Sequence, residues 1–543
     1  MNRRTVLTVT ALAGAAALWL AAQQQQQNAA KTLPELLPGG ALLAVEARDL
    51  NSLVSAWNAS PEKKTWLASG AYQSYIRSKL ALRLEEVQKD YATGLGVNPN
   101  YALLENIAGT EAALAVYDIG KLEMLYVTRL PQARAADNLL TRARTQFQAR
   151  TAAGQPYYTK AAGDGSVAFA IAGDLLIVGT REDLVANSLQ LLRDGNGASL
   201  RQERWYTQAA TAAAATNAPD VRLSVHMERT VRTPHFRSYW IQQNITALKA
   251  YSATVSDLYF GQAGWTEKRT LVRAEPQPAE ANATELAALA PYLPTDAGFL
   301  QAWAKPSVND VETLIRERFE PSSSSSTALQ LTAPGETSER REGREDDLDQ
   351  RIDTDEPVLL REGSRTLPIV RVGATPHVVA AAKVAGSRTL ADGVYATVDS
   401  AIVLLRDDTN WDSAAVQTAL RDSGVEPQGL APVHAIVDGK VLILSNSKPL
   451  AHRIAAKRGG ATSQGLSYKA VYRHSAERGN YGRIMRMIDF PKVPTTTPRA
   501  PMLFSENIAG IGDVLGAIES VTMESKEEGT VVRQSVVYQR KRS

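Results

Sequence analysis

Much of this sequence occurs as two related copies, and the repetition constrains the fold more than any single motif. Three pairs of segments match in the same order at an offset of about 260 residues, which chance similarity between short segments does not produce. The pairs are residues 37–50 with 293–311, residues 170–184 with 435–450, and residues 244–273 with 507–533. The second pair aligns with one residue inserted. The repetition predicts two tandem domains, residues 31–280 and residues 281–540.

The patterns within each copy predict strands joined mostly by short turns, with helices between them. Ala41–Ala47 has the pattern of a buried strand, and the helix that follows begins at Asp49. The spacing of apolar residues over 139–147 predicts a crossover helix. Hairpins are expected at residues 112–117 with 122–128 and at residues 167–171 with 175–178. Such an arrangement favours an α+β fold in which an antiparallel sheet is covered by helices.

Several helix ends carry specific signals. Thr180 and Asp183 match a capping box, and Gly195 matches a C-terminal stop, so a helix is expected between them. Gly109 is expected to end another helix in the left-handed conformation. Apolar residues at helical spacing over 76–91 predict a long surface helix.

The second copy departs from the first at residues 321–356, which contain a serine run and many charged residues. This segment lacks the apolar residues that a buried core requires, so we expect a disordered loop. It stands where the first copy has its long helix. A partner-binding segment and a solvated linker are the two interpretations of it.

The N-terminal segment, residues 1–30, predicts export from the cytoplasm. Arg3 and Arg4 precede an uncharged apolar stretch from Thr5 to Ala22, and a glutamine-rich stalk follows. An uncleaved membrane anchor and a cleaved signal both fit this pattern, and the two arginines also fit a loose twin-arginine signal. Arginines on the cytoplasmic side place the remaining chain outside. We therefore expect a single-pass protein of the cell envelope or, if the signal is cleaved, an exported periplasmic protein.

The composition of the 543-residue chain argues against several protein classes. With 44% hydrophobic and 22% charged residues, it resembles neither a disordered chain nor a polytopic membrane protein. The 60 basic and 57 acidic residues leave a net charge of +3, which gives no indication of nucleic-acid binding. The absence of cysteine excludes disulfides, thiol nucleophiles and thiolate metal sites.

Motifs that would indicate catalysis are missing. The 6 histidines are not spaced as metal ligands, and His226 and His434 lie in strand-like runs that favour a structural role. No serine has the flanking glycines of a nucleophile elbow. Residues 510–516 have the glycine spacing of a dinucleotide-binding loop, but they follow a helix-like segment rather than a strand. We therefore assign no catalytic, metal-binding or cofactor-binding residue and expect no cofactor.

One cluster of aromatic and basic residues is the candidate interaction surface. Such side chains suit a partner protein, a glycan or lipid headgroups. Packing of the aromatic rings between two short helices is the alternative interpretation. The cluster consists of Trp57, Lys63, Lys64, Trp66, Tyr72, Tyr75 and Arg77.

The opening of each copy, a Leu-Pro step with small residues before a strand and an aspartate-led helix, resembles a known group of proteins. These are the uncharacterised bacterial proteins of domain-of-unknown-function family three-three-five-two. Residues 57–67 and 109–123 resemble a subgroup of that family. The resemblance covers most of the first half and, more weakly, the second. It implies an envelope protein with a membrane-anchored N-terminus, and it implies no activity, so no functional residue is carried over.

Three functional hypotheses follow. The preferred one is a non-enzymatic envelope protein that acts as a scaffold or binds another protein, because duplicated domains without catalytic motifs motivate it. The second is a carrier or sensor that holds a lipid or other apolar ligand in a cleft. The third is a hydrolase whose carboxylates meet from distant positions in the sequence.

Overall fold

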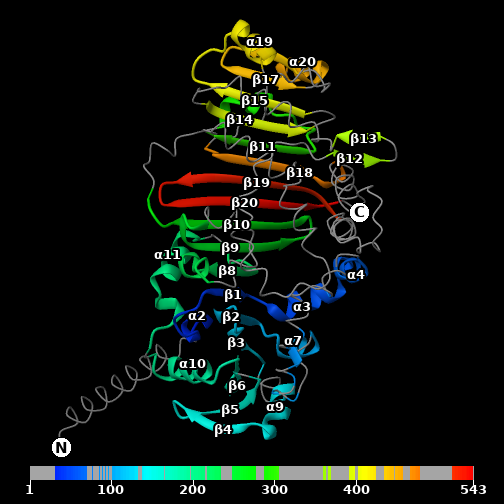
Figure 1. Ribbon diagram of the computed structural model, residues 1–543. Coiled ribbons are helices and arrows are strands. Elements are labelled where there is room, and N and C mark those ends of the chain that lie inside the picture. Colours follow the sequence, from blue (N-terminus) through cyan, green and yellow to red (C-terminus); the bar gives the residue numbers. More distant parts are fainter. Residues whose placement is uncertain are drawn as a thin grey trace, which may run out of the picture. The chain divides into compact units, whose positions relative to one another are not determined.

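The chain divides into two units, and strands within each unit pair with antiparallel neighbours, as the computed structural model shows (Figure 1). The first unit comprises residues 1–52, 88–208 and 224–240, and the second comprises residues 53–87, 209–223 and 241–543. The residues that the structure describes are 31–69, 101–131, 137–163, 165–195, 197–214, 217–233, 248–276, 286–304, 359–362, 365–368, 390–397, 401–422, 433–445, 447–456, 465–476 and 517–541, together with isolated positions between 72 and 96.

The first unit is a sheet with short helices. Its strands are β1 (Leu43–Ala47), β2 (Glu111–Asp118), β3 (Glu123–Arg129), β4 (Gln148–Ala152), β5 (Gln155–Ala162), β6 (Gly165–Ala172) and β7 (Leu175–Gly179). Its helices are α2 (Leu33–Leu36), α7 (Tyr101–Ile107), α9 (Leu139–Ala143), η1 (Arg144–Gln146), α10 (Glu182–Asp194), η2 (Leu200–Gln202) and α12 (Met227–Thr230). Three elements extend across the division between the units, namely α3 (Leu50–Ala59), α11 (Arg204–Ala212) and β8 (Val221–Val225).

Strands of the first unit pair in the order β1-β2-β3-β7-β6-β5-β4. A core cluster joins this sheet to α7 and α9, and it contains the fully buried side chains of Phe169 and Leu140. The ring of Phe169 stacks on Tyr158 at 5.2 Å and meets Phe147 edge-on at 5.1 Å. Alternate residues of a strand face the same side, so Val167 and Phe169 both enter this core.

The second unit also contains an antiparallel sheet. Its strands are β9 (Tyr251–Gly261), β10 (Gly264–Arg273), β11 (Phe299–Ala304), β12 (Leu359–Glu362), β13 (Arg365–Pro368), β14 (Leu390–Thr397), β15 (Ala401–Asp407), β16 (His434–Asp438), β17 (Val441–Ser445), β18 (Tyr468–Arg473), β19 (Ile518–Glu528) and β20 (Val531–Arg540). Its helices are α4 (Pro61–Ala68), η4 (Leu286–Ala288), η5 (Ala290–Tyr292), α19 (Ser413–Asp422) and α20 (Lys448–Ala456).

Strands of the second unit pair in the order β9-β10-β20-β19-β18-β11-β14-β15-β17-β16, and β12 pairs with β13 separately. The core cluster lies where α20 packs on β16 and β17, and Ile443 and Ile454 are both fully buried in it. Figure 1 shows α19 and α20 beside β17. The α+β class and the antiparallel sheet with helices are therefore as predicted.

One order of pairings occurs in both units. The order β1-β2-β3-β7-β6 in the first matches the order β11-β14-β15-β17-β16 in the second. The last two strands of each series form a hairpin whose turn contains a left-handed glycine, Gly173 at φ 65° and Gly439 at φ 60°. Both hairpins close over a two-residue turn, at Ala172↔Leu175 and at Asp438↔Val441.

Within the second unit, the hairpins β9–β10 and β19–β20 are joined through β10 and β20. Their turns close at Gly261↔Gly264 and Glu528↔Val531. Between the hairpins, Gly264 pairs with Gln539 and Val272 pairs with Val531, so the turn end of each hairpin meets the far end of the other. This register has local two-fold symmetry, and its central pair is Lys268↔Ser535.

Residues 148–162 correct one prediction. They form the hairpin β4–β5, which was not predicted, and the helix expected over 139–147 ends as η1, before an extended Phe147. The reason is that β4 has no apolar alternation, since its residues are exposed apart from the half-buried Ala152. Its extended form depends on hydrogen bonds to β5, which local sequence does not reveal.

Two predicted helix signals act differently from expectation, and one acts as predicted. Thr180 does not cap α10, because its hydroxyl accepts from the Met124 N–H at 2.8 Å and donates to the Leu122 carbonyl at 2.9 Å. Gly109 is not left-handed; a Cβ there would lie 2.0 Å from the Arg129 carbonyl oxygen, so close backbone approach requires glycine. Gly195 ends α10 with φ 64°, as predicted.

Several expectations concern residues outside the described ranges. These are the N-terminal segment 1–30, the loop 321–356, the glycine-spaced residues 510–516 and most of the helix expected over 76–91. Among the helices that the structure describes, none combines the length and apolarity needed to cross a membrane.

Candidate functional site

The candidate interaction surface is built on α3 and α4, two short helices with well-defined starts. Asp49 caps α3 by accepting the Ser52 N–H at 3.0 Å and the Ser52 hydroxyl at 2.7 Å. Ser60 caps α4 by accepting the Lys63 N–H at 3.1 Å, and Pro61 occupies the first turn, where its missing N–H has no cost. These caps fix the residue at which each helix begins.

Large apolar side chains of this segment are exposed to solvent. Trp57 of α3 is 42% exposed, Leu67 of α4 is 43% exposed, and Ile76 is 39% exposed. Among the described residues, Phe260 is the one other large hydrophobic side chain that is exposed to this degree. Within the described part of the chain, the exposed large apolar side chains are therefore concentrated between residues 57 and 76.

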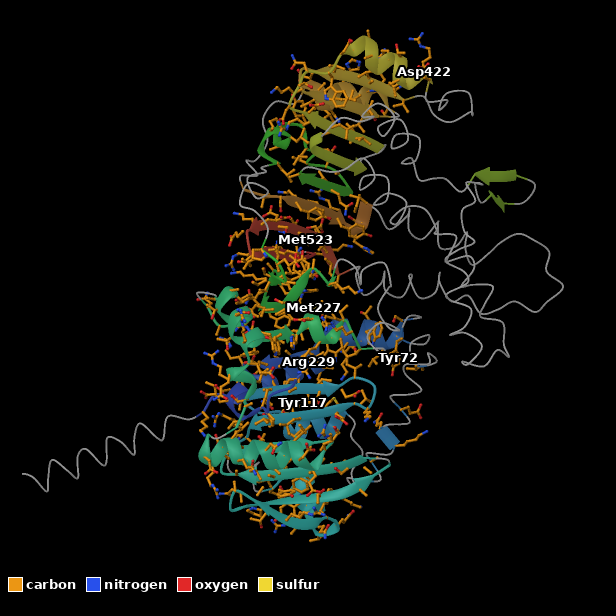
Figure 2. All side chains as sticks on the ribbon, turned by 60° about the vertical axis from the view of Figure 1, so that its left-hand side comes forward. Tyr72, Tyr117, Met227, Arg229, Asp422 and Met523 are labelled. Carbon is orange, nitrogen blue, oxygen red and sulfur yellow. The ribbon has the colours of Figure 1, made fainter. Side chains whose placement is uncertain are left out.

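The other predicted members of the surface have several environments. Trp66 meets Tyr72 edge-on at a centroid distance of 6.0 Å, so these two rings contact each other (Figure 2 labels Tyr72). Lys63 donates from Nζ to the Asn58 side-chain oxygen, whereas Lys64 is exposed. Tyr75 and Arg77 lie outside the described residues.

A second cluster, which the sequence analysis missed, lies in the first unit around the turn at Pro38–Gly40. The Gly40 N–H donates to Glu203 Oε1 at 2.6 Å, and Gly40 has φ 96°. The Gly39 N–H donates to the Ala198 carbonyl at 2.7 Å. The Tyr117 hydroxyl donates to the Pro38 carbonyl at 2.9 Å, and burial raises the pKa of this hydroxyl, with Glu203 adding to the rise. The turn is thus held by Glu203, by the Ala198 carbonyl and by a neutral tyrosine.

His226 joins this cluster at the end of β8. Its ring stacks on Trp205 with centroids 5.0 Å apart and an angle of 10° between the ring planes. The Trp205 Nε1–H donates to Glu203 Oε2, so one carboxylate binds both the indole and the Gly40 N–H. Helix α12 begins directly after His226. Figure 2 labels its residue Arg229, and it also labels Tyr117 on β2.

Two polar atoms of this region are buried without a hydrogen-bond partner in the structure, Ser224 Oγ and His226 Nδ1. Burial lowers the pKa of His226, Arg229 lowers it further, and Glu203 and Glu228 oppose the decrease. The imidazole is therefore mainly neutral at pH 7, and His226 lies directly after β8, at the start of α12, rather than within a strand. No group of three or more His, Asp or Glu side chains in the described ranges is arranged to hold a metal ion.

Comparison with known proteins identifies no family. No protein-family model matches the chain, and no curated protein matches it. Among solved structures, crystal form I of TP0453 is 11% identical with a TM-score of 0.24, covering 46% of this chain and 82% of that chain. Crystal form III of TP0453 is 11% identical with a TM-score of 0.26, covering 45% of this chain and 80% of that chain. Similarity at this level supports no functional argument.

Proposed function

We propose that the protein is a non-enzymatic protein of the cell envelope that binds a partner protein through its α3–α4 surface. This surface is defined by the described residues Trp57, Lys63, Lys64, Trp66, Leu67, Tyr72 and Ile76. The observation that carries the proposal is the exposure of Trp57 and Leu67, at 42% and 43%, on two capped helices.

The energetics of binding favour such a surface. Aromatic and aliphatic anchors that become fully buried at an interface typically cost about 2 kcal/mol or more when truncated. Trp57 and Leu67 are exposed in the free chain, so a partner can bury their apolar surface on binding. Helices that are already capped lose less conformational entropy on binding than a loop does.

Charge selects the kind of partner. Lys64 is exposed beside Leu67, Lys63 lies next to it, and the neighbouring Glu62 is paired with Arg540 at 3.2 Å, so positive charge prevails on this helix. We therefore infer a partner with an apolar hollow bordered by carboxylates, since complementary charges increase the association rate and orient the encounter.

The wider architecture of the proposal rests on duplication. We infer that residues 31–280 and 281–540 are related tandem domains, which the shared order β1-β2-β3-β7-β6 and β11-β14-β15-β17-β16 supports. We also propose membership of domain-of-unknown-function family three-three-five-two, with residues 1–30 as a membrane anchor and the rest of the chain outside the cytoplasm. The apolar stretch after Arg4 supports this placement.

Site-specific photocrosslinking tests the proposed surface. A photoreactive phenylalanine analogue would replace Leu67 in the full-length protein, and the matched control would carry it at Phe260, which is 52% exposed. In envelope membranes, the Leu67 position should give one discrete crosslinked protein, which excess unmodified chain competes away and which Trp57→Ala diminishes. Equal crosslinking from Phe260, or crosslinking that competitor does not reduce, would refute the proposal.

A further inference from the structure

The second cluster, around His226, has an arrangement that responds to protonation. His226 is fixed by two contacts. Its backbone N–H donates to the Leu42 carbonyl at 2.8 Å, and its ring stacks on Trp205. Its Nδ1 atom is enclosed and has no hydrogen-bond partner. A neutral ring tolerates this position, whereas a proton at Nδ1 would create a buried cationic N–H without an acceptor.

The stacking is coupled to the turn at Pro38–Gly40 through one carboxylate. Glu203 accepts from the indole of Trp205 and, at 2.6 Å, from the Gly40 N–H. The Tyr117 hydroxyl holds the same turn from β2 by donating to the Pro38 carbonyl at 2.9 Å. Any movement of Glu203 toward a charged imidazole therefore withdraws an acceptor from Gly40.

We propose that His226, Trp205 and Glu203 form a proton-operated latch, which holds the Pro38–Gly40 turn when His226 is neutral and releases it when His226 is protonated. Protonation supplies a cation next to the indole that Glu203 already binds. Glu203 then satisfies the imidazolium, and the Gly40 N–H loses its partner. The turn then keeps its hydrogen bonds from Tyr117 and to Ala198 but loses the one at Gly40, where a positive φ lets the backbone move.

Burial of the ring sets the direction of the response, and the charged groups around it modify the pKa further. Arg229 on α12 disfavours the imidazolium, while Glu228 on α12 and Glu203 before α11 favour it, and the net effect with burial is a pKa below the ordinary value of 6.5. On acidification, the His226 imidazole of the released state is therefore protonated at a higher pH than that of the closed state. The latch is fully stable above pH 6.5 and loses stability as the pH falls below that value toward the lower pKa of the closed state.

Hydrogen–deuterium exchange on the full-length protein tests the latch. Exchange at the imidazole C2 position, resolved by mass spectrometry, gives the pKa of His226, and amide exchange of the peptide containing Gly39 and Gly40 reports release of the turn. After correction for the intrinsic effect of pH, amide exchange of this peptide should increase several-fold on acidification, with the same midpoint as His226.

Two variants separate the latch from general acid loosening. His226→Gln keeps a polar planar side chain that does not titrate, so it should abolish the pH response of the turn. His452→Gln, at an exposed histidine of α20, should leave the response unchanged. An unchanged response in His226→Gln overturns the latch. A turn midpoint in the unmodified protein that differs from the His226 titration overturns it as well, whether or not the variant folds.

Discussion

Gly264→Ala is the substitution that most sharply tests the junction of β10 with β20. A Cβ at this position would lie 1.9 Å from the Tyr538 carbonyl oxygen, and Gly264 has φ 138°. The oxygen belongs to the backbone of the paired strand, so it moves only if the β10–β20 register opens. The β10–β20 hydrogen bonds and the Trp265–Tyr538 ring stack at 4.8 Å resist that opening.

The expected cost has two parts. Backbone strain for alanine at this φ contributes about 1–3 kcal/mol, and forcing a methyl group into a filled site contributes about 1–3 kcal/mol more. The sum is about 2–6 kcal/mol. Gly173→Ala is the control, because Gly173 has φ 65° but no atom within 4 Å of its would-be Cβ. It should cost about 1–2 kcal/mol from strain alone.

Amide exchange of peptides from β10 and β20 gives the free energy of local opening at the junction. Gly264→Ala should lower this free energy by about 2–6 kcal/mol. Gly173→Ala should leave β10 and β20 unchanged and should affect peptides of β6 and β7 instead. If Gly264→Ala costs no more at its own site than Gly173→Ala does, the steric part of the reasoning is refuted.

Three further predictions follow from the packing and the charges. Phe169→Ala should lower the stability of the first unit by about 3–5 kcal/mol in urea unfolding, because the ring is fully buried; a loss below 1 kcal/mol would contradict its place in the core. Asp257→Ala should cost about 3–5 kcal/mol, since it removes the buried carboxylate that binds Arg222 at 2.6 Å, whereas Asp296→Ala, which breaks an exposed pair with Arg453, should cost less than about 1 kcal/mol. Burial alone would raise the pKa of Glu267, but hydrogen bonds from Arg269 and Ser256 outweigh burial and lower this pKa below 4.5. The stability that the Glu267 carboxylate contributes is therefore present above pH 4.5 and is lost as the pH falls through the lower pKa of the folded state. Urea midpoints measured from pH 7 downward should therefore drop in the unmodified protein and drop less in Glu267→Gln.

The elements that were predicted correctly carry their information locally. β1 is a mostly apolar strand that follows two glycines, and Gly195 adopts a left-handed conformation that few other residues tolerate. β4 is different, because it is a strand through its pairing with β5 and its own residues show no alternation. Gly109 shows the same limit, since the carbonyl that requires glycine there belongs to Arg129 on β3.

The two candidate sites were accessible to sequence reasoning in different degrees. Trp57 and Trp66 are close in the sequence, so their cluster was found, but spacing alone could not tell that Trp57 is exposed while Trp66 packs on Tyr72. The His226 cluster joins Gly40, Glu203 and His226, which are far apart in the chain. Its available signal was Glu203 with Trp205 two residues later, a pair too common to indicate a site.

The symmetric register of β10 against β20 makes this seam self-complementary. The β10 edge of the β9–β10 hairpin pairs with β20 of the same chain, and β20 of a second molecule would form the same backbone hydrogen bonds with it. Pairing within one chain is favoured because covalent connection keeps the two hairpins at a high effective concentration. Cleavage between residues 274 and 517, or partial unfolding in a concentrated solution, would remove this high effective concentration. The hairpins of different molecules would then pair with one another. The junction of β10 with β20 is therefore also a position at which two molecules can exchange hairpins.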